Sequence, residues 1–250
     1  MSKMNENRIF MQCPSFREKM AESDQSKGVT PPPFGKPITG EVITLPTFEG
    51  ITNTTYADLL DTRRSVRSYT NKPMTQAELA FMLWSVNGIQ KIRNDVATFR
   101  PVPSGGARHP FETYITVQNV EGLKPGLYHY LPAENIGEKI VTIQYLRDIP
   151  DYEKTVTEMV VGQAWAAKAP IVLFYSCIPY KAEWRYHELS HRVQLIDLGH
   201  VGQNAMLSAA ALGLGSCCMA AYGQEACDAL IGLDGLEEYT VYGVAVGTPE

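Results

Sequence analysis

Three arginines lie close together in a chain whose net charge is -5. Arg63, Arg64 and Arg67 fall in the stretch RRSVRSY, with Ser65 between the second and the third. Arginine carries a planar, permanent charge whose paired N–H donors match phosphate oxygens, and a serine hydroxyl adds a further donor. The spacing predicts a phosphate site whose third arginine reaches an electron-rich ring. The alternative is a solvent-exposed basic turn.

A second polar segment has the sequence PVPSGGARHP and covers residues 101–110. Its centre is Pro103, Ser104, Gly105 and Gly106. The two glycines permit close approach of the backbone to a flat ligand and expose amide donors. Ser104, Arg108 and His109 add polar tips. The segment therefore predicts a ligand-binding loop, and the alternative is a plain connection into the next strand.

A third segment, GLGSCCMAA over residues 213–221, is a glycine turn that leads into a strand of small residues. It does not complete the Gly-x-Gly-x-x-Gly pattern of dinucleotide-binding folds, so we reject that type of site. The Gly-x-Ser-x-Gly elbow of the serine hydrolases is also missing, although Ser190, His191 and Asp197 lie nearby in the sequence.

The cysteine and histidine spacings do not predict a metal site. The five cysteines, at positions 13, 177, 217, 218 and 227, have neither Cys-x-x-Cys pairs nor a zinc-ligand pattern, so we expect reduced and mostly buried thiols. His187 and His191 are spaced for one helical face but lack a third ligand within reach in the sequence.

The composition limits the classes of partner. With 250 residues, 44% of them hydrophobic, the chain is large enough for one sizeable core. There is no long Lys/Arg stripe, so we do not expect nucleic acid as a partner. No apolar run reaches the roughly 20 residues of a membrane span, and residues 1–12 lack a signal-peptide core, so we expect a cytoplasmic protein without a membrane partner.

Residues 1–55 are expected to form an N-terminal arm, and residues 56–250 the folded body. Prolines at 31–33, 37 and 46 make a regular helix improbable in the arm, and for residues 1–28 an extended arm and a disordered tail stay equally open. In the body, residues 56–60 read as a short helix that delivers the arginines. Thr75 and Glu78 form a capping-box pattern before a core helix that ends near Gly88.

The remaining pattern predicts an α+β fold. Residues 113–117, 126–130 and 139–143 read as strands of an antiparallel meander, and the apolar run 171–175 reads as a central strand. We expect helices over 162–168 and over about 184–212, and a closing strand at 240–247. Strands that are mostly not parallel, combined with helices, are typical of this class.

The order of the motifs RRSVRSY, MLWSVNGIQ, PSGGARHP, DLGHVGQN, ALGLGSC and VYGVAVG resembles the flavin-dependent nitroreductase superfamily over about residues 30–250. Within it, the chain looks most like the SagB-type dehydrogenases, which oxidise azoline heterocycles in peptides. The resemblance implies an α/β/α sandwich and an intertwined homodimer that holds FMN at its subunit interface. It also implies ping-pong hydride transfer through the flavin N5, with NAD(P)H as donor and a small-molecule or peptide substrate.

The resemblance also implies roles for individual residues. Arg63, Arg64 and Ser65 would bind the phosphate and ribityl oxygens of FMN, and Arg67 would lie near the N1/O2 edge of its ring. The loop Pro103, Ser104, Gly105 and Gly106 would lie along the ring from the partner subunit, and Cys218, Met219, Ala220 and Ala221 would face N5.

One departure from the family pattern bears on the activity. The Lys-Tyr pair of the azoline dehydrogenases falls on Arg185 and Tyr186, the catalytic candidates. Tyrosine can still carry a proton, but arginine is a poor general base because it does not release its proton at working pH. Three readings stay open: an FMN-dependent oxidoreductase, a peptide azoline dehydrogenase, and a non-catalytic flavin-binding scaffold subunit.

Overall fold

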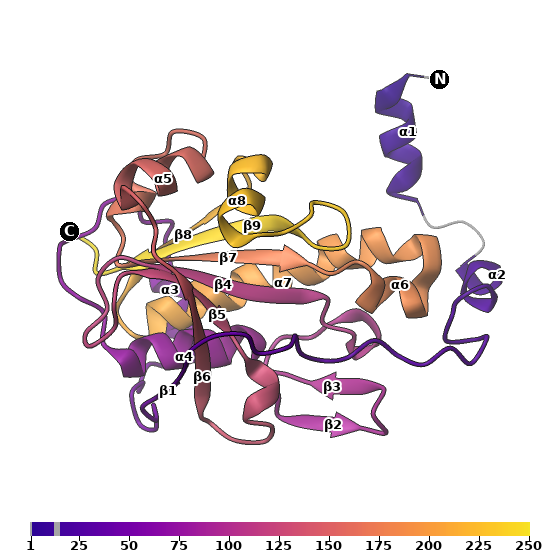
Figure 1. Ribbon diagram of the computed structural model, residues 1–250, viewed down its shortest axis with the longest axis horizontal. Helices are drawn as coiled ribbons and strands as arrows, with labels where there is room; N and C mark the ends of the chain where they lie inside the picture. Colours follow the sequence, from indigo (N-terminus) through magenta and orange to yellow (C-terminus); the bar gives the residue numbers. More distant parts are fainter. Residues whose placement is uncertain (1, 13–15) are drawn as a thin grey trace.

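A seven-stranded antiparallel sheet forms the centre of the molecule in the computed structural model, which describes residues 2–12 and 16–250 (Figure 1). The strand order is β1-β6-β5-β4-β7-β9-β8, and every neighbouring pair is antiparallel. The strands are β1 Val42–Leu45, β4 Phe111–Val117, β5 Gly126–Tyr130, β6 Val141–Arg147, β7 Ile171–Cys177, β8 Gly215–Met219 and β9 Tyr239–Gly247. The predicted meander over residues 113–143 is confirmed, with its last strand at 141–147 in place of 139–143, and so is the central position of the apolar strand 171–175.

Helices cover both faces of the sheet (Figure 1). On one face lie α4 (Gln76–Asn87) and α7 (Ser190–Ala211), and on the other lie α5 (Tyr152–Met159) and α8 (Gln224–Ile231). Successive residues of a strand point to opposite faces, so the wholly buried β7 contributes to both cores. Leu173 packs in the α4/α7 core and Phe174 in the α5/α8 core. This arrangement is the predicted α+β sandwich.

Helix α4 begins with the predicted capping box. The Thr75 backbone N–H donates to the Glu78 carboxylate at 2.7 Å, and the Glu78 backbone N–H donates to the Thr75 hydroxyl at 3.2 Å. Such an N-cap typically contributes about 1 kcal/mol to stability. Leu79, Met82 and Leu83 are fully buried, and the helix ends before Gly88.

Two predicted helices differ from the observed ones. The region 184–212 is not continuous, because His187 adopts φ 49° and ψ −136°, which ends α6 (Tyr180–Tyr186) and starts a 3₁₀ turn, His187–Leu189, before α7. Residues 162–168 form turns and a 3₁₀ helix, Ala166–Lys168, because Val161 and Gly162 both have positive φ and end the preceding α5.

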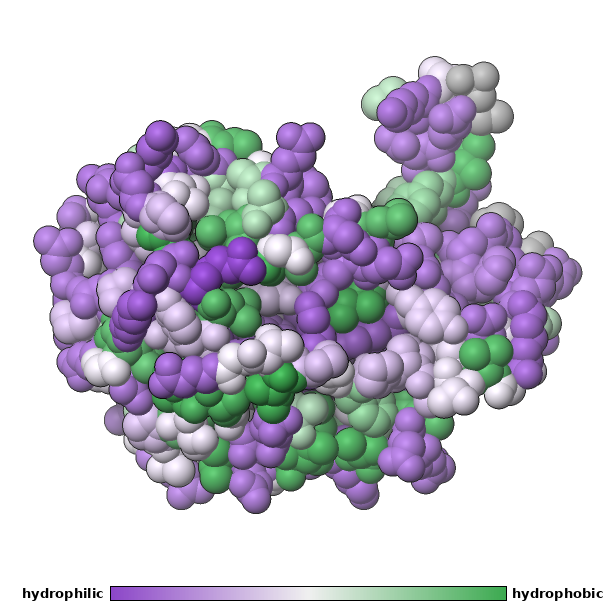
Figure 2. All heavy atoms as spheres, in the orientation of Figure 1, coloured by the Kyte–Doolittle hydropathy of each residue, from purple (hydrophilic) through white to green (hydrophobic). Residues whose placement is uncertain are grey.

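The N-terminal arm is extended only in part. Residues 29–41 contain no helix and run across the sheet to β1, the edge strand (Figure 1). Upstream, α1 (Lys3–Phe10) and α2 (Phe16–Ala21) are helical, so the expectation of an arm without regular helix is wrong there. Helix α1 has no buried residue and extends away from the body (Figure 2). Cys13 lies outside the described residues.

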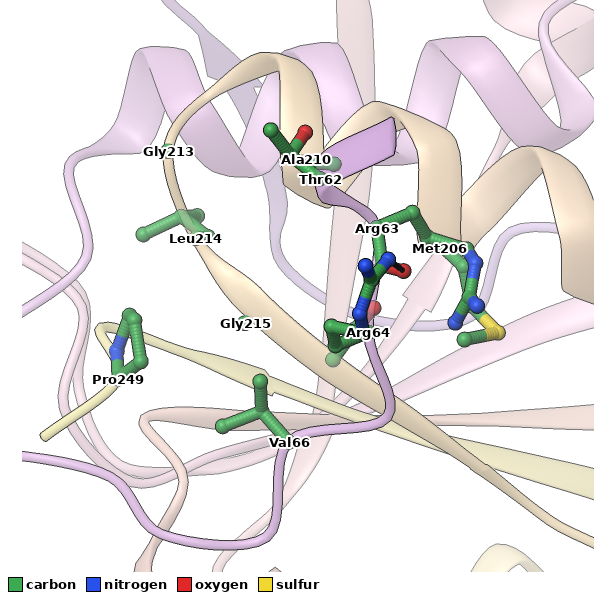
Figure 3. A pocket seen from close by; sticks show the side chains of 11 residues that line it. Thr62, Arg63, Arg64, Val66, Met206, Ala210, Gly213, Leu214, Gly215 and Pro249 are labelled. Carbon is green, nitrogen blue, oxygen red and sulfur yellow. Dashed lines mark hydrogen bonds between the residues drawn. The ribbon is translucent and has the colours of Figure 1, made fainter. Parts of the chain in front are cut away.

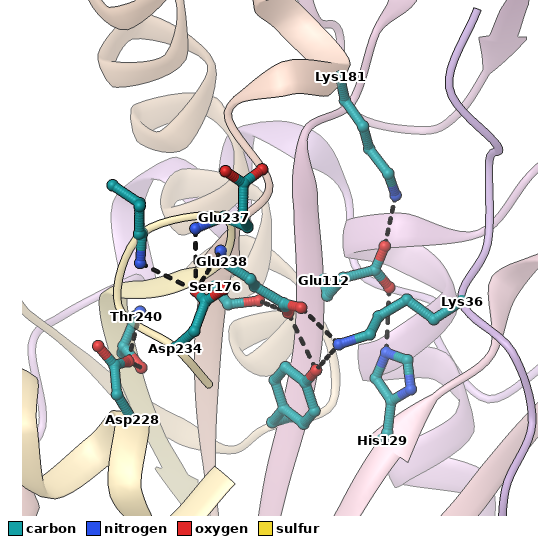
Figure 4. Close-up of polar contacts among 12 residues, drawn as sticks. Lys36, Glu112, His129, Ser176, Lys181, Asp228, Asp234, Glu237, Glu238 and Thr240 are labelled. Atoms are coloured by element: carbon teal, nitrogen blue, oxygen red, sulfur yellow. Dashed lines mark hydrogen bonds and ion pairs between the residues drawn. The ribbon is translucent and has the colours of Figure 1, made fainter. Parts of the chain in front are cut away.

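A buried network of charges fastens the arm to the sheet (Figure 4). The Glu112 carboxylate accepts from the Lys181 ammonium at 2.5 Å and lies 3.0 Å from the His129 ring nitrogen. From the arm, Lys36 pairs with Glu238 and donates to the Tyr114 hydroxyl at 2.7 Å. Burial alone would raise the pKa of Glu112, but Lys181 and His129 outweigh it and hold that pKa well below its usual value.

The remaining described elements are short. Helix α3 (Tyr56–Thr62) precedes the arginine cluster, and β2 (Lys91–Arg93) pairs with β3 (Ala97–Phe99) in a separate hairpin. Within residues 2–12 and 16–250, no helix combines the length and hydropathy required to cross a lipid bilayer.

Candidate functional site

The arginine cluster lies between the end of α3 and the outer edge of β8. Thr55 caps α3 by accepting from the Asp58 N–H, and Arg63 is the residue at which the helix ends. The chain then runs beside β8, where Ser65 forms a parallel bridge with Ser216 and the Val66 N–H donates to the Ser216 carbonyl at 2.9 Å. The sheet edge therefore fixes the backbone of RRSVRSY, as a phosphate site requires.

Arg63 and Arg64 open onto a hollow of about 280 Å³ (Figure 3). The hollow is lined by residues from three segments: Thr62, Arg63, Arg64, Val66, Met206, Ala210, Gly213, Leu214, Gly215, Ser216 and Pro249. In the part of the chain that the structure describes, neither arginine forms an ion pair. Among the described residues, Arg64 donates only to the Arg63 carbonyl, at 2.8 Å. Two cations without a carboxylate partner beside a cavity fit an anionic ligand.

Arg67 and Ser65 do not line this hollow. The Arg67 guanidinium lies 5.7 Å from the centre of the Trp165 ring, a cation–π contact, and the side chain is exposed. The structure thus places Arg63 and Arg64 at one hollow and Arg67 beside it, on the side that also holds the buried Tyr69.

Strand β8 carries two adjacent cysteines that point to opposite faces of the sheet. Cys217 is buried, whereas the half-buried Cys218 faces α7, where its thiol lies 3.6 Å from the Gly202 carbonyl. Burial raises the pKa of Cys218 to about 11, so the thiol stays neutral at pH 7. The strand ends at Met219, and Ala220 and Ala221 are exposed residues beyond it, which corrects the prediction of one strand through Ala221.

The predicted loop Pro103–Gly106 is held by an acid on α7. The Asp197 carboxylate accepts from the Ser104 hydroxyl at 2.6 Å and from the Gly105 N–H at 3.0 Å. Burial raises the pKa of Asp197, and these two hydrogen bonds partly offset that rise. Pro103 is exposed, whereas Ser104, Gly105 and Gly106 are half-buried. The sequence places Asp197 in the motif DLGHVGQN and near Ser190 and His191, and neither position signals its contact with the loop.

Arg108 and His109 do not serve as polar tips of this loop. Arg108 is buried and donates to the Lys181 carbonyl at 2.8 Å, and its guanidinium lies 4.6 Å from the Trp184 ring centre. Burial lowers the pKa of His109 to about 3, so the neutral ring donates to the Thr98 carbonyl at 2.9 Å. Both side chains therefore point into the protein and stabilise the loop through these contacts.

The catalytic candidates Arg185 and Tyr186 form the last turn of α6 and lie against the glycines of the loop. A Cβ added at Gly106 would lie 2.4 Å from the Arg185 Nε and 2.9 Å from the Tyr186 hydroxyl. Gly106 also has φ 60°, so both the lack of space for a Cβ and the backbone conformation favour glycine at this position. The Arg185 Nη1 donates to Gln25 of the N-terminal segment at 2.7 Å.

The predicted site residues therefore form two groups within one chain. Arg63 and Arg64 lie beside Met206 and Ala210, near the end of α7, whereas Ser104 and Gly105 contact Asp197 in its first half. Along α7, Met206 and Ala210 lie nine and thirteen residues after Asp197, which corresponds to about 14 and 20 Å. One chain does not bring the arginine hollow and the glycine loop together.

Comparisons with known proteins agree on one family. The model of the nitroreductase family matches residues 60–248. A putative nitroreductase of Methanocaldococcus jannaschii is 33% identical over 165 residues, which are 66% of this chain and 78% of the relative. The microcin B17-processing protein McbC of Escherichia coli is 30% identical over 128 residues, 49% of this chain and 44% of McbC. The matched region thus spans less than half of McbC.

Solved structures show the same fold. A putative nitroreductase from Ralstonia eutropha superposes with a TM-score of 0.63 at 18% identity, over 86% of this chain and 98% of that one. The E. coli microcin synthetase McbBCD complex with truncated pro-MccB17 bound contains a chain that matches with a TM-score of 0.59 at 22% identity, over 86% and 79%. At these identities the likeness concerns the fold alone.

Proposed function

Because this chain belongs to the nitroreductase family, as its motifs predicted, we propose that it is an oxidoreductase that uses FMN. The observation that carries this proposal is the hollow at Arg63 and Arg64, whose guanidinium groups have no carboxylate partner among the described residues. A phosphate group would satisfy both.

Besides the positive charge, the site offers a hydroxyl donor and small side chains that suit FMN. Ser65 is exposed next to the arginines and offers a hydroxyl for the ribityl chain, and the first four side chains of β8 are small. Arg67 supplies a positive charge that would favour electron density on a nearby ring. Bound FMN would supply a ring that accepts and donates hydride, which no side chain of the protein does.

The separation of the two groups of site residues supports a homodimer. We infer that Ser104–Gly106 of one subunit lie beside the arginine hollow of the other, because about 14 to 20 Å of helix α7 lies between their contacts in one chain. Leu195 and Ile196 of α7 are 56% and 49% exposed, so this helix presents two adjacent large apolar side chains that a second copy would cover. Replacement of both by glutamate is expected to yield monomers in sedimentation experiments, and a dimer that persists would contradict this contact.

The residues around the loop have definable tasks in this site. Asp197 would hold the Ser104–Gly105 backbone in place, and the Tyr186 hydroxyl would lie next to Gly106, close enough to pass a proton to a substrate. We propose that two substrates use the site in turn, with NADH or NADPH as donor and an organic molecule or oxygen as acceptor.

The test of this function is the visible absorption spectrum of the anaerobic protein before and after NADH or NADPH is added. A flavin band that bleaches supports a nicotinamide-driven oxidoreductase. A protein that binds no FMN after reconstitution contradicts the proposal.

The similarity to McbC and to the trifolitoxin-processing protein TfxB of Rhizobium leguminosarum, 31% identical over 118 residues, favours a second candidate, a peptide azoline dehydrogenase. In this version Tyr186 handles the proton, and Tyr186→Phe is expected to retain flavin but lose peptide oxidation. Because Arg185 replaces the lysine of that subfamily, a flavin-binding scaffold subunit is the third candidate. It would bind FMN that neither a nicotinamide nor a cyclised peptide reduces.

A further inference from the structure

A second hollow lies on the outer side of the glycine loop, beneath the β2–β3 hairpin. Its volume is about 390 Å³. It is lined by residues of the hairpin, the loop and α6: Arg93, Asn94, Val96, Ala97, Phe99, Gly106, Ala107 and Arg185. The hairpin pairs with no strand of the main sheet (Figure 1); it forms this wall and also accepts hydrogen bonds from Arg108 and His109.

The charge of this hollow is positive. Arg93 and Arg185 line it, and no acidic residue does. Asp95, at the tip of the hairpin, is exposed and is not among the lining residues. Arg108 lies behind the wall, and its pKa is lowered to about 10, mainly by burial and then by the charge of Arg185. Within the described residues, none of these three arginines forms an ion pair.

Arg185 is held in place before any ligand arrives. Its Nη1 donates to the Gln25 side chain at 2.7 Å, and its guanidinium lies 5.6 Å from the centre of the Tyr186 ring. Gln25 is itself fixed, because its backbone N–H donates to the Trp184 carbonyl at 2.8 Å. A guanidinium that is already positioned loses less conformational entropy when it binds an anion.

The same hollow offers an apolar surface beside the charges. Phe99 is 43% exposed, and Val96 and Ala97 adjoin it. An aromatic ring in the wall of a pocket favours a ligand with a flat or apolar body. The combination suits a molecule that carries an acidic group on such a body.

We propose that this hollow binds the carboxylate or phosphate of a small organic anion, held by Arg93 and Arg185 with its apolar part on Phe99. The location next to Gly106 and Tyr186 makes this anion a substrate of the oxidoreductase, a role that rests on the proposed function. Arg185 then acts as a substrate clamp and not as a general base, in keeping with its permanent charge.

The test compares benzoate with benzamide, which have nearly the same shape but differ in charge, by calorimetric titration of the full-length protein. Benzoate is expected to bind about tenfold more tightly, and Arg93→Gln to remove that preference. Lys91→Gln is the matched control, since it removes one positive charge from the same strand without touching the hollow. It is expected to change benzoate binding less than about twofold. Thermal unfolding of both variants checks that they fold.

Equal binding of the two probes, or equal losses in Arg93→Gln and Lys91→Gln, would overturn the proposal. The titration needs no flavin, and FMN content is measured separately by absorbance, so a failure of the proposed function does not mask the result. A second comparison identifies the source of the anion. If Arg93→Gln lowers the rate of flavin reduction by NADPH but not by NADH, the site takes the extra phosphate of the donor. If both rates persist while the benzoate preference is lost, it takes the carboxylate of the other substrate.

Discussion

Two charged regions of this protein differ in how their charges are satisfied. Around Glu112, two lysines and two carboxylates pair with one another inside the fold, with a histidine and a tyrosine as further partners (Figure 4). At Arg63 and Arg64, two guanidinium groups face a hollow, and no carboxylate of the described residues forms an ion pair with them (Figure 3). The first region is complete within the chain, and the second is not.

The difference separates structural charge from binding charge. A buried charge is tolerated when partners and hydrogen bonds compensate for its desolvation, and removing one partner leaves the other uncompensated. A cationic cluster at a cavity keeps its water until an anion displaces it. Substitutions in the first region should therefore change stability, and substitutions in the second should change ligand binding.

The largest expected effect is on the stability of Glu112→Ala. The substitution leaves the buried Lys181 without its carboxylate, so we expect a loss of about 3–5 kcal/mol in the free energy of unfolding. Chemical denaturation measures it, with the exposed Glu121→Ala as a control that should change stability by less than about 0.5 kcal/mol. A loss below about 1 kcal/mol would show that the network is not a structural element.

A smaller effect is expected in the pH dependence of stability. The folded pKa of Glu112 is lowered, so its contribution is complete above the unfolded pKa of about 4.3 and is lost as pH falls toward the folded value. Glu112→Gln cannot be protonated further. Its stability should therefore fall less steeply below pH 4.3, by at most about 1.4 kcal/mol per pH unit relative to the wild type. Parallel stability curves between pH 2 and pH 7 would contradict the assignment.

The smallest effect is expected at Arg67. If its charge lies near the flavin ring, Arg67→Gln should lower the two-electron midpoint potential of bound FMN by about 30 mV, which corresponds to about 1.4 kcal/mol. Spectroelectrochemical titration measures this shift. The exposed Arg147→Gln, at the end of β6, serves as the control. Equal midpoint potentials in Arg67→Gln and the wild type would show that the Arg67 charge does not act on the flavin ring.

Much of the fold could be predicted because its signals are local. The capping box at Thr75 and the apolar strand 171–175 are each encoded in a few adjacent residues. The break at His187 could not be predicted, since the helical pattern continues through it and the positive φ reflects packing of the surrounding chain. The prolines at 31–33, 37 and 46 predict an arm without regular helix, but they lie after α1 and α2 and do not restrict those residues.

The candidate site was predictable in its residues more than in its arrangement. Residue types alone indicated the arginines and the glycine loop, and the structure adds the hollow at Arg63 and Arg64. The contact between Ser104 and Asp197 joins residues 93 positions apart, and nothing in either segment signals the other. The separation of the loop from the arginines along α7 likewise follows only from three-dimensional structure.

The central claim is that the arginine hollow binds the phosphate of FMN, and titration of the flavin-free protein with FMN tests it most directly. The account predicts that Arg63→Ala with Arg64→Ala weakens FMN binding about 100-fold or more, because each charge-assisted contact contributes about 1.5–3 kcal/mol, while the unfolding free energy stays within about 0.5 kcal/mol of the wild type. Riboflavin, which lacks the phosphate, should bind the variant and the wild type alike. Unchanged FMN affinity in the folded double variant would contradict the account.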